Sequence, residues 1–162
     1  MKYALFAFAL GFLASGLGSR PALAATSIAS FAVTATVQAG CQVSAPATAF
    51  GIYTTAGANA TSAVSVACTH PTAYSVNLSA GLAPGDTATA QKMRGPVSAL
   101  LDSRLLSDYA RTVNWGRTAG TDTVTGTGNG SSPAHAVFGQ TAGAQYVAPG
   151  AYGDTITVTV TY

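Results

Sequence analysis

Short windows of alternating apolar and polar residues recur along this chain, and most are bounded by Gly, Pro, Asn or Asp. Alternation at period two puts successive side chains on opposite faces of a strand, so it predicts β-strands. The clearest windows are 31–37, 63–68, 74–79 and 154–162. Because helical spacing is scarce and the strands are short, the sequence predicts an all-β protein of the sandwich or barrel class.

The last window alternates most strictly. Its apolar face carries Ile156, Val158, Val160 and Tyr162, and its other face carries threonines. The first window presents Phe31, Val33, Ala35 and Val37 on one face. The chain ends inside its last strand, so we expect no later segment to cover that strand's edge. An exposed apolar edge tends to pair with a further strand.

Glycine and proline mark the expected loops at 83–86, 116–133 and 148–150. The glycines at 126–130 superficially resemble a phosphate-binding loop. Such a loop needs a helix after it, whereas a proline and another apparent strand follow here, so turn chemistry is the favoured interpretation. Residues 97–106 fit helical and strand spacing alike, and a short helical turn there is left open.

Residues 1–24 have the features of a signal peptide. Lys2 precedes an apolar run from Tyr3 to about Leu17, and Ala24 ends an A-x-A-like cleavage site. The alternative is a membrane anchor, but this run of about 15 residues contains glycines and is short for a bilayer span of roughly 20. We therefore expect an exported protein that meets the membrane only through the export machinery.

Without residues 1–24 the chain has no net charge. Its cations are Lys92, Arg94, Arg104, Arg111 and Arg117, and its anions are Asp86, Asp102, Asp108, Asp122 and Asp154. No basic patch remains to neutralise phosphates, which argues against nucleic-acid binding. Low net charge also gives little repulsion between copies of the chain.

The two cysteines, Cys41 and Cys68, are expected to form a disulfide because an exported chain meets an oxidising compartment. Closing the loop between them would stabilise the fold by about 3 to 4 kcal/mol. A metal site is the alternative, but it needs further ligands, and His70 and His135 form no ligand cluster in the sequence. We expect no metal and no cofactor.

No residue set predicts an enzyme. The Gly-x-Ser-x-Gly elbow of many hydrolases is absent, and the two histidines are interpreted as turn or surface residues, with His135 in a loop after Pro133. Asp102 and Asp108 are better explained as caps or as partners of neighbouring arginines than as a catalytic pair.

Several phrases occur in an order that is more specific than any one of them. They are an alternating strand ahead of Gly40-Cys41, FGIY at 50–53, VACTHPTAYSVNLSAG at 66–81, Trp115-Gly116, GTGNG at 126–130, VFG at 137–139 and GAYGDTITVTVTY at 150–162. Together they resemble the spore coat U domain family, which includes subunits of archaic, Csu-type chaperone-usher pili. The resemblance spans nearly all of residues 25–162.

The resemblance implies an incomplete immunoglobulin-like β-sandwich, completed by a donor strand from another subunit or from a chaperone. Residues 25–38 would be the donor segment, and residues 39–162 would be the sandwich domain. The donor residues would be Phe31, Val33, Ala35 and Val37, and the edge strand of the acceptor groove would carry Ile156, Val158, Val160 and Tyr162. The implied partners are a periplasmic pilus chaperone, an outer-membrane usher and other pilin subunits. The fibre would stand at the cell surface and serve adhesion and biofilm formation.

Two alternatives stay open. The segment 31–37 could be the first strand of a self-complete sandwich. The protein could also be a secreted glycan-binding, coat or matrix domain that does not polymerise, with Trp115 and the loop 116–133 at a sugar site. A single tryptophan beside a glycine is more often a core residue, so we expect Trp115 in the core.

Overall fold

The computed structural model describes residues 24–162. The predicted signal peptide, apart from its last residue, lies outside the described residues. The chain divides into two units, Met1–Ala35 and Thr36–Tyr162. Among the described residues, none of the helical structure is long and apolar enough to cross a membrane.

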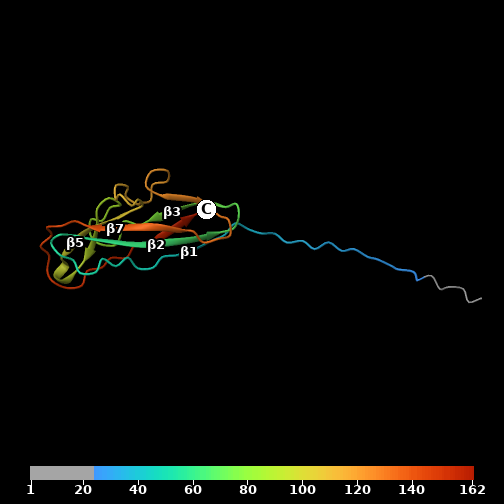
Figure 1. Ribbon diagram of the computed structural model, residues 1–162, viewed down its shortest axis with the longest axis horizontal. Coiled ribbons are helices and arrows are strands. Elements are labelled where there is room, and N and C mark those ends of the chain that lie inside the picture. The colour runs from blue at the N-terminus through green and yellow to red at the C-terminus, as the bar shows by residue number, and fades with distance from the viewer. Residues whose placement is uncertain (1–23) are drawn as a thin grey trace, which may run out of the picture. The chain divides into compact units, whose positions relative to one another are not determined.

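Two antiparallel sheets make up the second unit (Figure 1). The larger sheet has the strand order β1 (Cys41–Ser44), β2 (Ala58–Cys68), β7 (Ala134–Thr141), β5 (Leu100–Leu106) and β4 (Gln91–Arg94). The smaller sheet has the order β6 (Val124–Thr127), β3 (Ala73–Leu78) and β8 (Val158–Thr161). The protein is therefore all-β, with the two-sheet architecture expected of an immunoglobulin-like sandwich.

The core lies between the sheets and is built from alternate residues of β2 and β3. Its buried members on these strands are Val64, Val66, Cys68, Tyr74, Val76 and Leu78. Trp115 is fully buried among them, and its indole Nε1 donates a hydrogen bond to the carbonyl oxygen of Val76 at 2.9 Å. Trp115 is thus a core residue, as expected, and it has no exposed face on which a sugar could stack.

One expected loop assignment was wrong, and another was correct only in part. Residues 116–133 contain β6, which pairs with β3 and has Gly126 opposite Tyr74. A side chain at position 126 would overlap the Tyr74 ring, so the glycine is required by sheet packing and not by a turn. His135 does not lie in a loop. It lies on β7, opposite Val64 of β2.

The ambiguous segment 97–106 is mostly strand. A single 3₁₀ turn at Pro96–Ser98 precedes β5, and the inward side chains of β5 follow strand alternation. The expected strand 31–37 is not formed, and residues 24–40 adopt neither helix nor strand. A strand needs a neighbour for its backbone hydrogen bonds, and the described residues supply none to this segment.

Asp108 caps the loop that follows β5. Its carboxylate accepts hydrogen bonds from the backbone N–H of Val113 at 2.8 Å and of Thr112 at 2.9 Å. The bond from Val113 is the main reason that the pKa of Asp108 lies below its usual value. Arg111 does not pair with Asp108, since its guanidinium lies over the Phe138 ring, 5.6 Å from the centroid.

Cys41 and Cys68 form the predicted disulfide, with 4.1 Å between their Cα atoms. They are directly opposite each other in the β1–β2 pairing. The bond therefore ties the four-residue edge strand β1 to the long central strand β2.

We expect the free energy of unfolding of the Cys41→Ala/Cys68→Ala double variant to be about 3 kcal/mol lower than that of the wild type, because the unfolded chain regains the freedom of the intervening loop. Urea unfolding of the exported protein measures this difference. Intact mass of the wild type under non-reducing denaturing conditions should rise by about two units on reduction. Free thiols in the native protein would contradict the assignment.

A side-chain hydrogen bond links the two sheets, with 3.0 Å between the hydroxyl of Tyr74 on β3 and Nε2 of His135 on β7. Partial burial lowers the pKa of His135 below its usual value, because desolvation disfavours the charged ring. The unfolded chain then binds a proton more readily than the folded chain does. The stability that neutral His135 contributes is present above about pH 6.5 and is lost as pH falls through its lower folded pKa.

His135→Gln should remove this part of the acid sensitivity, because glutamine can still bond to Tyr74 but does not titrate. Urea unfolding at pH 7.5 and pH 5 should show a smaller difference for the variant than for the wild type. The exposed turn residue His70 provides the matched control, His70→Gln. Equal pH dependence in the wild type and His135→Gln would refute the explanation.

Candidate functional site

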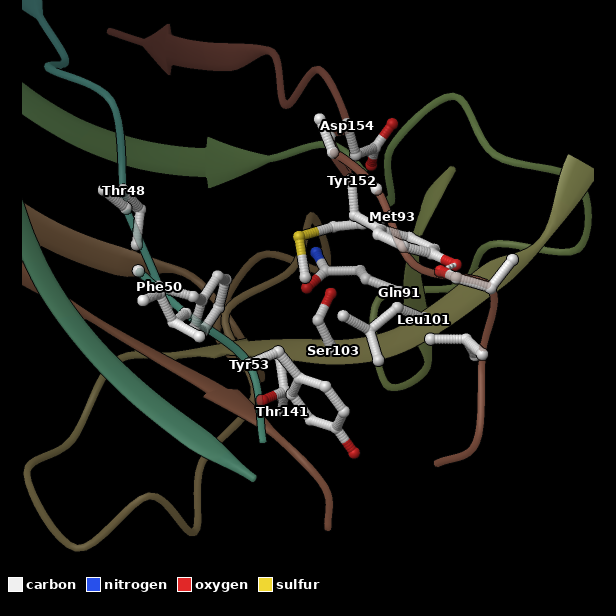
Figure 2. A pocket seen from close by; sticks show the side chains of 18 of the residues that line it. Thr48, Phe50, Tyr53, Gln91, Met93, Leu101, Ser103, Thr141, Tyr152 and Asp154 are labelled. Carbon is white, nitrogen blue, oxygen red and sulfur yellow. Dashed lines mark hydrogen bonds between the residues drawn. The ribbon is translucent and has the colours of Figure 1, made fainter. Parts of the chain in front are cut away.

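An open groove of about 760 Å³ lies between two irregular segments of the sandwich (Figure 2). One rim is the segment 48–53, between β1 and β2, and the other rim is the segment 147–156, which leads into β8. The floor comes from β4, β5 and β7 and includes Gln91, Met93, Leu101, Ser103, Leu105 and Thr141. The groove is therefore an opening into the space between the sheets.

Side chains hold the first rim in place. The Tyr53 hydroxyl donates to the carbonyl oxygen of Ala142 at 3.0 Å and accepts from the backbone N–H of Gln145 at 3.1 Å. The Phe50 ring packs against Gly139 of β7, where a Cβ would lie only 2.8 Å from the ring. The segment 48–53 belongs to no strand, and these contacts attach it to the C-terminal end of β7.

The second rim is held by backbone bonds at two points. Gly153 and Arg94 exchange N–H···O bonds of 2.9 and 3.1 Å, which tie the rim to the end of β4. Farther along, Ser79 donates its N–H to the carbonyl oxygen of Thr157 at 2.9 Å, and the Ser79 hydroxyl accepts from the N–H of Thr157 at 2.8 Å. These bonds lead the chain into β8.

Among the described residues, β8 pairs with β3 alone, so one of its two edges is free. Strand pairing extends over Val158–Thr161, which is shorter than the expected 154–162. Period-two burial nevertheless begins before the strand, because Ile156, Val158 and Val160 are half-buried and pack on the core. Tyr162 departs from this row, since it is 59% exposed.

Three buried polar side chains cross the groove floor in one row. Strand register places Gln91 of β4 opposite Ser103 of β5, and Ser103 opposite Thr141 of β7. In Figure 2 the Ser103 hydroxyl points toward the Gln91 side chain. Met93 and Leu101 adjoin the row on one side, and Leu105 adjoins it on the other.

Gln91 connects the two sheets at this level. Its Oε1 accepts from the backbone N–H of Leu105 at 2.8 Å, and its Nε2 donates to the carbonyl oxygen of Ser79 at 3.3 Å. Because Ser79 also bonds to Thr157, one buried amide joins the groove floor to the rim that leads into β8.

The chemistry of the groove suits binding of an apolar segment. Asp154 is the single charged residue in its lining, and its Oδ1 accepts from the backbone N–H of Leu82 at 2.9 Å. Among residues 24–162, no three or more His, Cys, Asp or Glu side chains lie close enough together to hold a metal ion. Hydroxyl and apolar side chains beside a free strand edge can hold an extended chain by hydrogen bonds and burial.

The residues singled out from the sequence fall into two places. Ile156 lines the groove, and Val158 and Val160 continue its row along β8. Phe31, Val33 and Val37 are more than 80% exposed, in a segment without secondary structure. The polar floor residues were missed, because their apposition depends on strand register that no sequence signal reveals.

Comparison with known proteins places this geometry in a family. None of the curated proteins matches the chain. A chain in the crystal structure of the CsuC-CsuE chaperone-tip adhesion subunit pre-assembly complex, from archaic chaperone-usher Csu pili of Acinetobacter baumannii, is similar with a TM-score of 0.57 and 20% identity. The match covers 78% of this chain and 41% of that one, and it supports the sandwich fold.

The model of the Spore Coat Protein U domain matches residues 27–159, which is most of the chain and includes both rims of the groove. The chain therefore belongs to the Spore Coat Protein U domain family.

Proposed function

We propose that this chain is a subunit of an archaic-type chaperone-usher surface fibre and that it polymerises by donating residues 25–38 of one copy to the groove of the next. The observation that carries the proposal is the open groove along the segment that leads into β8, together with the free edge of that strand. Family membership and the sandwich fold agree with it.

The donor segment has the pattern that such a groove requires. Phe31, Val33, Ala35 and Val37 alternate with polar or small residues, and no strand within the described residues pairs with this segment. Burial of its three large apolar side chains would contribute on the order of 5 to 9 kcal/mol, at about 1.5 to 3 kcal/mol each. Backbone bonds to the free edge of β8 add to this contribution.

The half-covered core also explains the proposed partners. A free apolar edge is prone to wrong pairing, so a newly exported subunit needs a temporary strand until assembly. A periplasmic chaperone supplies that strand, and an outer-membrane usher is the place where the donor segment of the next subunit replaces it. The fibre then stands at the cell surface and supports adhesion and biofilm formation. The proposed role is structural and involves no catalysis or cofactor.

The main alternative is a secreted glycan-binding or coat protein that does not polymerise. Burial of Trp115 removes the aromatic platform that favoured a sugar site. That alternative does not explain the exposed apolar alternation at 31–37, so a fibre subunit explains the chain better.

Val33→Asp should abolish polymerisation and leave the sandwich intact, because it puts an unpaired carboxylate into the apolar groove of the neighbour. Thr34→Asp is the matched control, since its side chain lies on the opposite strand face, and it should still polymerise. Unboiled gel ladders and fibre counts by electron microscopy measure assembly. Far-UV circular dichroism melting of the subunit released from its chaperone measures the fold.

Deletion of residues 25–38 provides the stricter test, because a donor strand is dispensable for its own subunit. The truncated protein should keep its disulfide and melting temperature but form no ladder. Unfolding of the body by Val33→Asp or by the deletion would show instead that the segment is an intramolecular strand. Fibres that persist in the deletion variant would refute donor exchange altogether.

A further inference from the structure

Apolar alternation alone does not determine how far a donor strand slides along the groove. A slip of one residue would turn every apolar side chain outward, but a slip of two residues keeps the same face inward. The groove must therefore contain a feature that distinguishes one inward-facing donor residue from the next. This question rests on the proposed donor exchange and goes beyond it.

The polar row across the floor is such a feature. Gln91 is 2% exposed and has both amide atoms bonded within the protein. Thr141 is also satisfied, since its hydroxyl accepts from the N–H of Ala58 at 2.8 Å and donates to its carbonyl oxygen at 3.3 Å.

Ser103 differs from these two neighbours. It is 8% exposed and lines the groove, and its hydroxyl, which makes no hydrogen bond to another group of residues 24–162, is not among the fully enclosed polar atoms and so stays open to the groove. A buried hydroxyl that an apolar side chain covers loses its bond to water, which is unfavourable. Space left above Ser103 would let a water molecule keep that bond.

The donor face offers one residue that leaves such space. Its order is Phe31, Val33, Ala35 and Val37, and Ala35 is the smallest of the four. We propose that Ser103, at the centre of the polar row, is the register-determining residue of the groove and that it receives Ala35 of the neighbouring copy. Valine in this place would press a branched apolar group onto the hydroxyl and displace the water.

The proposal predicts a specific coupling between two positions on different copies of the chain. In fibres of the full-length exported protein, Ala35→Val should dissociate roughly tenfold faster than wild type in SDS at a set temperature, because overpacking and loss of the water destabilise the joint. Fibres of Ser103→Ala alone should dissociate more slowly than wild type, because the groove no longer covers a hydroxyl. Fibres that carry both changes should dissociate within about twofold of Ser103→Ala, because the hydroxyl that opposes valine is gone.

Val33→Leu and Val37→Leu, each with and without Ser103→Ala, are the matched controls. Ser103→Ala should not slow the dissociation of either control variant, since the proposed register places both positions away from Ser103. Relief of either control, or independent effects of Ala35→Val and Ser103→Ala, would overturn the register and leave donor exchange standing. Absence of a ladder in the wild type would overturn the proposed function itself. Melting of released Ser103→Ala subunit should match the wild type, which separates a change at the joint from damage to the fold.

Discussion

Ile156, Val158 and Val160 pack on the core with one flank uncovered, because among the described residues β8 has a hydrogen-bonded partner on its β3 side alone. Apolar burial stabilises a domain in proportion to the area removed from water, so covering this half-buried row would stabilise the domain further. The open groove continues this row past Ile156. In the described part of the sandwich, one edge of β8 therefore stays open to a further strand.

The two rims of the groove lie outside the strands, and other interactions hold them in place. The disulfide between Cys41 and Cys68 secures the short edge strand β1. Tyr53 tethers the segment 48–53 through two hydrogen bonds to the chain after β7. Gln91 joins the floor to the opposite rim through Ser79. These contacts hold both rims of the groove in place.

Sequence reasoning succeeded where one strand carries its own signal. The alternation at 63–68 and 74–79 corresponds to β2 and β3, and the cysteine pair gave the correct disulfide. It failed where packing by a distant segment decides. Thr125 and Gly126 read as loop residues, yet the Tyr74 ring needs a glycine on the neighbouring strand.

The groove floor shows the same limit more sharply. Gln91, Ser103 and Thr141 are polar, far apart in the sequence and typical of a surface, and strand register alone makes them neighbours. The deeply buried Gln91 departs from the rule that polar residues lie outside, because two backbone groups satisfy its amide. Departures of this kind concentrate where a site has requirements beyond stability.

The free edge of β8 is not protected by the usual devices against aggregation. Proline and charge are absent from β8 itself, whose outward side chains are threonines, and the chain after residue 24 has no net charge to keep copies apart. A monomer would have to bury or block such an edge permanently. A fibre subunit has to leave it competent for a single partner strand, and under the proposed exchange selectivity then passes from the edge to the floor. Backbone groups of β8 can bond to any extended chain, whereas under the proposed register the Ser103 hydroxyl on the floor favours a strand with its smallest inward residue at that point.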